Sequence, residues 1–277
     1  MTYCIAIKLK AGLVMLSDSR TNAGVDHIST FRKMTIYEKQ GDRVMCLLAS
    51  GNLAVSQAVR QRLALGFGGK TIWSAANMFE VAQLIGDAIR SVAKREEEAL
   101  KAAGVDFNVS LLLGGQIKGE EPRLFHIYTA GNFIEATDEN CYFQIGESKY
   151  GKPIIDRVVS PETSLDEAAK CALISMDSTL KSNLSVGLPL DLLVYQADAL
   201  AVTHVSHIDE KNAYFQMIRS TWGNRLKQVF SEIEAPTWTA RSEQLKFYKP
   251  LRDEHAAQAE TVGVDNTPTP PQLSLGA

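Results

Sequence analysis

The order in which two hydrophobic periods follow one another is the strongest constraint on the fold. Apolar residues alternate in the opening segment, around Ile5, Ile7 and Leu9, whereas from residue 53 they recur three and four positions apart. Alternation is typical of strands, and the longer spacing of amphipathic helices. The whole chain runs as strands, two helices, strands, two helices, strands and a last helix. Because strands and helices do not alternate singly, we expect stacked sheets covered by helices rather than a parallel sheet of βαβ units.

The individual elements follow from these periods and from the turns between them. A turn at residues 10–12 separates two apolar runs and predicts a hairpin at the amino terminus. Strands are expected at 3–9, 13–16, 34–37, 44–48, 107–113, 123–129, 133–136, 190–196 and 201–208. Helices are expected at 53–65, 75–103, 148–159, 165–181 and 209–230. Ser164, followed by two acidic residues, predicts the start of the fourth helix.

Length and composition predict one large globular domain. The chain has 277 residues, of which 45% are hydrophobic and 22% charged, as in ordinary soluble proteins. We expect the domain to span residues 1–250. Residues 251–277 contain three prolines and no aromatic residue, so we expect a flexible tail there.

Charge and cysteine usage exclude several kinds of partner. The formal net charge is −3 and no dense Lys/Arg stripe is present, so nucleic acid is not an expected partner. No apolar run approaches the roughly 18 residues of a membrane span, and the amino terminus lacks the pattern of a signal peptide. The four cysteines are widely spaced and form no CxxC pair: Cys4, Cys46, Cys141 and Cys171. We therefore expect a reduced, cytoplasmic protein without a zinc site or a disulfide framework.

Thr2 is the first candidate for chemistry. A small second residue permits removal of Met1, which would leave an amino-terminal threonine. Such a residue carries a hydroxyl nucleophile and an α-amine that titrates near neutral pH, so one residue supplies nucleophile and base. Many proteins begin Met-Thr, and the interpretation needs further residues.

Asp18, Lys33 and Gly51 are those further residues. Asp18 ends the second expected strand and Lys33 precedes the next, so the Asp18 carboxylate can hold the Lys33 ammonium close to Thr2. The ammonium would then lower the pKa of the Thr2 hydroxyl. Gly51 lies in a strand-to-helix turn, where unpaired backbone N–H groups can stabilise an oxyanion. Taken singly, the two charges also fit a solvated surface, and the turn also fits a plain helix cap at Asn52.

Together these residues resemble the proteasome β-subunit family of N-terminal nucleophile hydrolases. The matching segments are Thr2, LVMLSDSRTNAG at 13–24, FRKM at 31–34, LLASGN at 47–52 and SNLSVGLPLDLL at 182–193. Within that family the chain is most similar to Anbu, the ancestral β-subunit-like bacterial group, over residues 2–235. The resemblance implies an α+β fold, a four-layer αββα sandwich, hydrolysis of a peptide or small amide, and a homo-oligomeric ring or open lock-washer.

The resemblance also assigns roles to single residues. Thr2 falls on the nucleophile, Asp18 on the orienting carboxylate and Gly51 on the oxyanion-hole glycine. Lys33 falls on the catalytic lysine if a one-residue length difference is allowed, whereas an ungapped match places Met34 there. We choose Lys33 because a thioether carries no charge.

Other positions concern the substrate pocket and departures from the family pattern. The resemblance places the substrate pocket at Asn22, Arg32, Lys33 and Met45, whose polar members argue against a simple hydrophobic preference. Glu147 stands where the family has a serine, and Asn183 replaces an acid. Glu147, Asn183 and Ser185 are candidate supporting residues, but these departures weaken the case for efficient peptidase activity.

Two alternatives therefore stay open beside the threonine peptidase. One is a catalytically weak or inactive oligomeric scaffold, and the other is an amidohydrolase acting on small amides or γ-glutamyl compounds. No GxSxG, HEXXH or P-loop pattern is present, so we expect no metal and no cofactor. An unfoldase partner cannot be identified from the sequence.

Overall fold

The computed structural model describes residues 2–23 and 27–238 of the chain, without the side chains of residues 21–29. The chain divides into two units, Met1–Lys227 and Gln228–Ala277. The domain boundary expected at residue 250 lies outside the described residues, so the flexible tail stays a prediction. No helix in the described part is both long and apolar enough to cross a membrane.

Two five-stranded antiparallel sheets form the centre of the first unit. One has the order β10-β1-β2-β11-β12 and the other the order β5-β6-β7-β8-β9. The first contains β1 (Tyr3–Leu9), β2 (Gly12–Asp18), β10 (Tyr142–Gly146), β11 (Leu190–Gln196) and β12 (His204–Ile208). The second contains β5 (Met34–Lys39), β6 (Arg43–Gly51), β7 (Val109–Ile117), β8 (Arg123–Ile127) and β9 (Phe133–Glu135). A separate pair, β3 (Arg20–Ala23) and β4 (His27–Thr30), follows β2.

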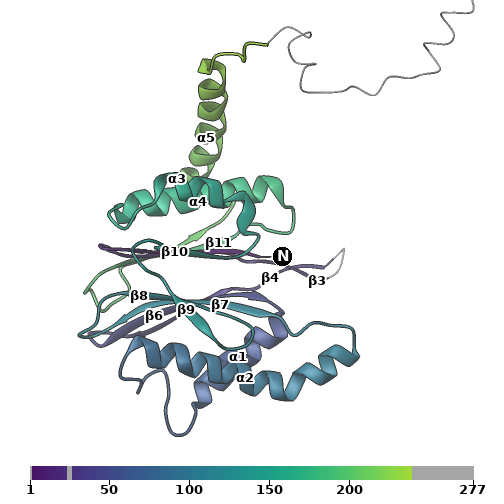
Figure 1. The fold of residues 1–277 in the computed structure, drawn as a ribbon, viewed down its shortest axis with the longest axis vertical. Helices are drawn as coiled ribbons and strands as arrows, with labels where there is room; N and C mark the ends of the chain where they lie inside the picture. The colour runs from purple at the N-terminus through teal and green to yellow at the C-terminus, as the bar shows by residue number, and fades with distance from the viewer. Residues whose placement is uncertain (1, 24–26, 239–277) are drawn as a thin grey trace, which may run out of the picture. The chain divides into compact units, whose positions relative to one another are not determined.

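Helices cover the outer face of each sheet. Figure 1 shows α1 and α2 against the second sheet and α3 and α4 against the first, with the sheets face to face between them. The helices are α1 (Leu53–Leu65), α2 (Met78–Ala102), α3 (Lys152–Val158), α4 (Leu165–Ser182) and α5 (Ala213–Glu232), with a 3₁₀ turn η1 (Ser148–Tyr150). The expected four-layer αββα sandwich is confirmed.

Three apolar layers hold the sandwich together, and β2 shows how one strand serves two of them. Val14 and Leu16 pack towards α3 and α4, whereas Leu13 and Met15 pack between the sheets. Successive side chains point to opposite faces of a strand, and both faces are covered here. A strand of this kind has an uninterrupted apolar run, as residues 13–16 do.

Three expectations about elements were wrong. Strand β10 was missed because its partner is β1, far away in sequence, where Ile5 lies opposite Gln144. The β3–β4 pair was missed because its residues are largely polar. The helix expected at 148–159 is two elements, which meet at Gly151.

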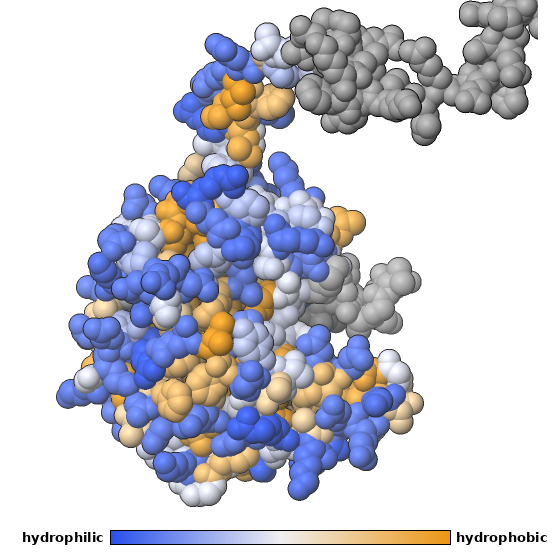
Figure 2. Space-filling view, in the orientation of Figure 1, coloured by the Kyte–Doolittle hydropathy of each residue, from blue (hydrophilic) through white to orange (hydrophobic). Residues whose placement is uncertain are grey.

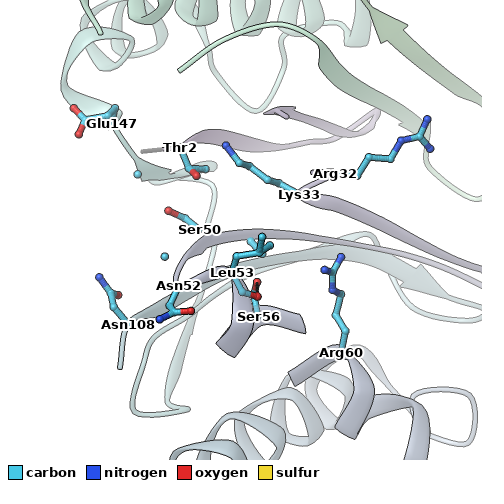
Figure 3. Close-up of a pocket in the computed structure, with 13 residues that line it drawn as sticks. Thr2, Arg32, Lys33, Ser50, Asn52, Leu53, Ser56, Arg60, Asn108 and Glu147 are labelled. Atoms are coloured by element: carbon cyan, nitrogen blue, oxygen red, sulfur yellow. Dashed lines mark hydrogen bonds between the residues drawn. The ribbon is translucent and has the colours of Figure 1, made fainter. Parts of the chain in front are cut away.

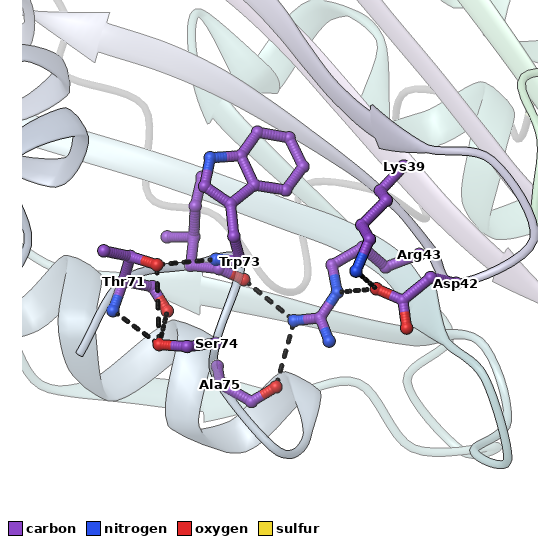
Figure 4. A network of polar contacts seen from close by, with 8 residues as sticks. Lys39, Asp42, Arg43, Thr71, Trp73, Ser74 and Ala75 are labelled. Atoms are coloured by element: carbon purple, nitrogen blue, oxygen red, sulfur yellow. Dashed lines mark hydrogen bonds and ion pairs between the residues drawn. The ribbon is translucent and has the colours of Figure 1, made fainter.

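A buried arginine fastens the loop between α1 and α2 to the second sheet. Arg43, at the start of β6, is 7% exposed. Its Nη1 donates to the carbonyl oxygens of Ile72 and Ala75, each at 2.9 Å, and its Nε lies 2.6 Å from an Asp42 carboxylate oxygen (Figure 4). Because both carbonyls are buried by this contact, the guanidinium replaces the water that they would otherwise bind.

The substitution Arg43→Met tests this contact. We expect the free energy of unfolding to fall by about 2–4 kcal/mol, because two carbonyl groups lose their donor. Urea unfolding at one fixed protein concentration measures the change. Arg95→Met, which removes an exposed arginine of α2, is the matched control and should be near neutral. Equal effects of the two substitutions would contradict the assignment.

Candidate active site

The end of β10 holds Thr2 in place. Thr2 immediately precedes β1 and is 8% exposed, and its carbonyl oxygen accepts the Glu147 N–H at 2.8 Å. Gly146 lies opposite Tyr3 with φ of +82°, and a Cβ there would stand 1.9 Å from the Thr2 carbonyl oxygen. Only glycine permits this approach and this backbone angle together.

The next residue, Tyr3, is fixed at both its side chain and its backbone. Its hydroxyl lies 2.6 Å from the Ser175 hydroxyl and accepts a hydrogen bond from Gln144 Nε2 at 2.5 Å. Its backbone N–H donates to Asp18 Oδ1 at 3.0 Å. The side chain is fully buried, so the position of Thr2 is set by the core.

Asp18 and Lys33 form a buried ion pair beside Thr2. Lys33 Nζ lies 2.7 Å from Asp18 Oδ1, and the two side chains are 8% and 0% exposed. Lys33 Nζ also donates to the Arg20 carbonyl oxygen at 2.7 Å. Burial raises the pKa of the Asp18 carboxyl, while the Lys33 ammonium and the N–H groups of Tyr3 and Gly187 oppose the rise. Figure 3 shows the Lys33 side chain directed towards Thr2 rather than into solvent.

The geometry favours Lys33 over Met34 as the cation of the site. Met34 begins β5, is 7% exposed and packs in the apolar layer between the sheets. The residue before the strand therefore faces the carboxylate, and the first residue of the strand faces the core.

A pocket of about 520 Å³ opens in front of Thr2. Figure 3 shows that its walls come from the ends of strands in both sheets and from the first turns of α1. The lining residues are Thr2, Arg32, Lys33, Ala49, Ser50, Gly51, Asn52, Leu53, Ser56, Arg60, Asn108, Gly146 and Glu147. The pocket thus offers hydroxyl, amide, guanidinium and ammonium groups around one threonine. No group of three or more His, Cys, Asp or Glu among the described residues could hold a metal ion.

The turn at Gly51 both caps helix α1 and lies at the pocket. Asn52 caps α1, because its side-chain oxygen accepts the N–H groups of Ala54 and Val55. Gly51 lines the pocket with φ of +105°, and a Cβ there would stand 2.4 Å from the Asn108 carbonyl oxygen. The turn is therefore a helix cap at the edge of the pocket, and the oxyanion role of Gly51 stays a prediction.

The structure brings together most of the residues selected from the sequence. Thr2, Lys33, Gly51, Arg32 and Glu147 line the pocket, and Asp18 lies behind Lys33. This clustering unites residues from separate segments of the chain around the predicted nucleophile.

Met45 is a correction to the expected substrate pocket. It is fully buried in the layer between the second sheet and helices α1 and α2, and it does not line the pocket. Among the residues of β6, only those from Ala49 onwards line the pocket. Met45 lies four residues earlier, which corresponds to roughly 13 Å along an extended strand. Met45 therefore stabilises the core rather than contacting substrate.

Three other candidates are less directly placed. Asn22 pairs with Ile28 through the β3–β4 ladder, and its side chain lies outside the described part. Asn183 is the C-cap residue of α4, and its side-chain oxygen accepts the Ser185 N–H at 2.9 Å. Neither Asn183 nor Ser185 lines the pocket, so their supporting role stays a prediction.

Sequence reasoning missed Arg60, Ser56 and Asn108 as pocket residues. The signal for two of them was present, because residues four apart lie on one face of a helix. Ser56 and Arg60 follow the Asn52 cap at this spacing and so extend the pocket face along α1. Asn108 had no such signal, since its place depends on the pairing of β6 with β7.

Comparison with known proteins gives a family match over most of the chain. The family model described as "Proteasome subunit" matches residues 2–191. No curated protein gives a significant match.

Solved structures of Anbu proteins are similar over nearly their whole length. Anbu (ancestral beta-subunit) from Yersinia bercovieri is 51% identical, with 86% of this chain and 100% of that chain covered and a TM-score of 0.80. Anbu from Hyphomicrobium sp. strain MC1 is 45% identical, with coverage of 85% and 100% and a TM-score of 0.77. A structure titled "Helical Assembly of the Anbu Complex from Pseudomonas aeruginosa" is 43% identical, with coverage of 85% and 98% and a TM-score of 0.81.

A double-mutant cycle tests the buried ion pair. Asp18→Asn leaves an ammonium without its counter-charge, and Lys33→Met leaves a carboxylate, so each should cost about 3–5 kcal/mol of unfolding free energy. The double variant should cost clearly less than the sum, because no unpaired charge remains. Urea unfolding of the three variants measures the coupling.

The exposed pair of Lys10 and Glu162 is the control. Its atoms are also 2.7 Å apart, but the side chains are 67% and 63% exposed. The cycle of Lys10→Met and Glu162→Gln should show no measurable coupling. Additive losses at Asp18 and Lys33 would show that they do not form the pair described.

Proposed function

The chain belongs to the proteasome subunit family, and we propose that it is an N-terminal nucleophile hydrolase in which Thr2, freed by loss of Met1, attacks an amide carbonyl. The single observation that carries this proposal is the buried Lys33–Asp18 pair beside Thr2 at the base of a pocket. An ammonium held in that place stabilises a threonine alkoxide and favours a neutral α-amine.

The proposed reaction proceeds through an acyl-enzyme. The Thr2 α-amine accepts the hydroxyl proton while Thr2 Oγ bonds to the substrate carbonyl carbon, and the Gly51 N–H stabilises the resulting oxyanion. The amide C–N bond then breaks, and its nitrogen takes the proton from the α-amine. Water, deprotonated by the same amine, attacks the ester and releases the acid and free Thr2. Asp18 does not touch substrate and acts by holding Lys33.

Removal of Met1 is a condition of this mechanism. While Met1 remains, the nitrogen of Thr2 is part of an amide and cannot accept a proton at neutral pH. The proposed activity therefore depends on processing by an aminopeptidase, which a small second residue permits.

We extend the proposal to a cytoplasmic homo-oligomer of the ring or open lock-washer type. The Pseudomonas aeruginosa relative is titled a helical assembly. Helix α5 of this chain has the exposed apolar side chains Leu226, Val229 and Phe230, and Ile233, which directly follows the helix, is exposed as well. Figure 2 shows orange surface among the polar residues of this helix. Exposed apolar surface of this kind favours association between subunits. The four cysteines are unpaired, which fits a reducing compartment.

The rival function is an oligomeric scaffold of the same fold without useful turnover. Glu147 favours it, because a carboxylate in the pocket replaces the serine of the family pattern. Asn183 favours the scaffold as well. It replaces an acid of the family pattern, and it does not line the pocket, so it does not take over the role of that acid there.

Covalent labelling separates the two functions. We expect a peptide epoxyketone to form one adduct on Thr2 of the Met-processed protein, detected by mass spectrometry of the intact chain and its peptides. Thr2→Ala should abolish the adduct and lower kcat/KM for any cleaved amide by roughly a thousand-fold or more, because the hydroxyl nucleophile is lost while the α-amine remains. Thr137→Ala, at a threonine outside the pocket, is the control and should label normally. An unlabelled Thr2 in the processed, assembled protein would support the scaffold instead.

A further inference from the structure

We propose that the Arg32–Arg60 side of the active-site pocket binds a carboxylate carried by the acyl part of the substrate, so that glutamyl amides are preferred over uncharged glutaminyl amides. The inference rests on the proposed function and deepens it by naming the substrate class. It follows from how the charges of the pocket are paired.

Two of the three cations that line the pocket have no counter-ion in the described part of the chain. Lys33 is paired with Asp18 at 2.7 Å. Neither Arg32 nor Arg60 has an Asp or Glu oxygen within 4.0 Å among the described residues, although both line the pocket. The cationic charge that remains available to a ligand therefore belongs to the two arginines.

Arg60 is the more constrained of the two. It is half-buried on α1, and its Nη1 donates to the Thr35 hydroxyl at 3.1 Å. A guanidinium has five N–H donors, and its other N–H groups make no hydrogen bond with the described residues. A partly desolvated cation gains more from an arriving anion than a fully exposed one does, and a carboxylate matches the fork of a guanidinium.

The charges are also separated in space. Figure 3 shows Arg32 and Arg60 on one side of Thr2 and Glu147 on the other. Glu147 lies 3.8 Å from Lys149 and donates its N–H to the Thr2 carbonyl oxygen, so it is tied to the opposite wall. A substrate with one carboxylate is attracted to the arginine side and repelled from the Glu147 side, which fixes the direction in which it binds.

The rest of the lining gives little support to a large apolar group. The remaining side chains are mostly polar, and Met45 belongs to the core. Ala49 and Leu53 are the apolar side chains of the lining, and the polar ones are Ser50, Asn52, Ser56 and Asn108. The Ser56 hydroxyl donates to the Leu53 carbonyl oxygen and the Asn52 side-chain oxygen caps α1, so these two groups do not depend on the substrate. The polar surface that they form with Ser50 and Asn108 favours a polar glutamyl group over a leucyl or phenylalanyl group.

Two kinds of glutamyl substrate share the required chemistry. In an α-glutamyl peptide the free carboxylate is in the side chain, and in a γ-glutamyl amide it is the α-carboxylate. In both, three carbons separate that carboxylate from the carbonyl that Thr2 would attack. The structure argues for the shared carboxylate, and the experiment distinguishes the two sources.

The test compares aminocoumarin amides of acetyl-glutamate, acetyl-glutamine and acetyl-leucine with the γ-glutamyl amide. We expect kcat/KM for at least one glutamyl substrate to exceed that for acetyl-glutamine about ten-fold or more. Arg60→Gln and Arg32→Gln should each reduce this ratio several-fold. Arg60→Lys should keep part of the ratio, and Arg95→Gln, an exposed arginine of α2, should keep all of it. A glutaminyl or leucyl preference, or a ratio that neither pocket substitution changes, would overturn the inference.

A binding measurement keeps this result separate from the chemistry. Calorimetry with Thr2→Ala protein, which lacks the nucleophile, compares an acetyl-glutamyl with an acetyl-glutaminyl peptide. Tighter binding of the glutamyl peptide, lost in Thr2→Ala/Arg60→Gln, supports the carboxylate site even if Thr2 is not labelled. Equal binding overturns the site even if Thr2 is labelled and the enzyme is active.

Discussion

The buried ion pair of Asp18 and Lys33 is the interaction on which the rest of the site depends. It joins the end of β2 in one sheet to the residue before β5 in the other, and Asp18 Oδ1 also accepts the N–H of Tyr3. The nucleophile, the cation and the junction of the two sheets are thus parts of one arrangement. Two buried charges of this kind are stable only while each has the other, so a change at the sheet junction also disturbs Thr2.

The sequence predicted the parts of the site that depend on local pattern. Asp18 ends a clear apolar strand, Gly51 ends another, and Asn52 caps the helix after it, so their positions relative to their own elements were predictable. Met45 was misplaced because a family match gives the strand but not how far along it the pocket extends. Strand β10 was missed because its polar Gln144 hides the alternation and its partner, β1, is set by tertiary packing.

The pocket contains two charge systems with different uses. The first is closed, since the Lys33 ammonium is satisfied by Asp18 and by the Arg20 carbonyl oxygen. It can tune the chemistry of Thr2 without being displaced by a ligand. The second is open, since Arg32 and Arg60 line the pocket without a carboxylate partner among the described residues. Separation of this kind lets substrate choice vary while the groups that act on the scissile bond stay fixed.

We expect Lys33 to control the proton equilibrium of Thr2. Nitrogen-15 NMR of the Met-processed protein, labelled at threonine, measures the titration of the Thr2 α-amine directly. We predict that the pKa of this amine is lower in the native protein than in a Lys33→Met variant shown to be folded, because the ammonium disfavours a second positive charge nearby. An amine pKa that is the same in both proteins, or lower in the variant, would contradict it.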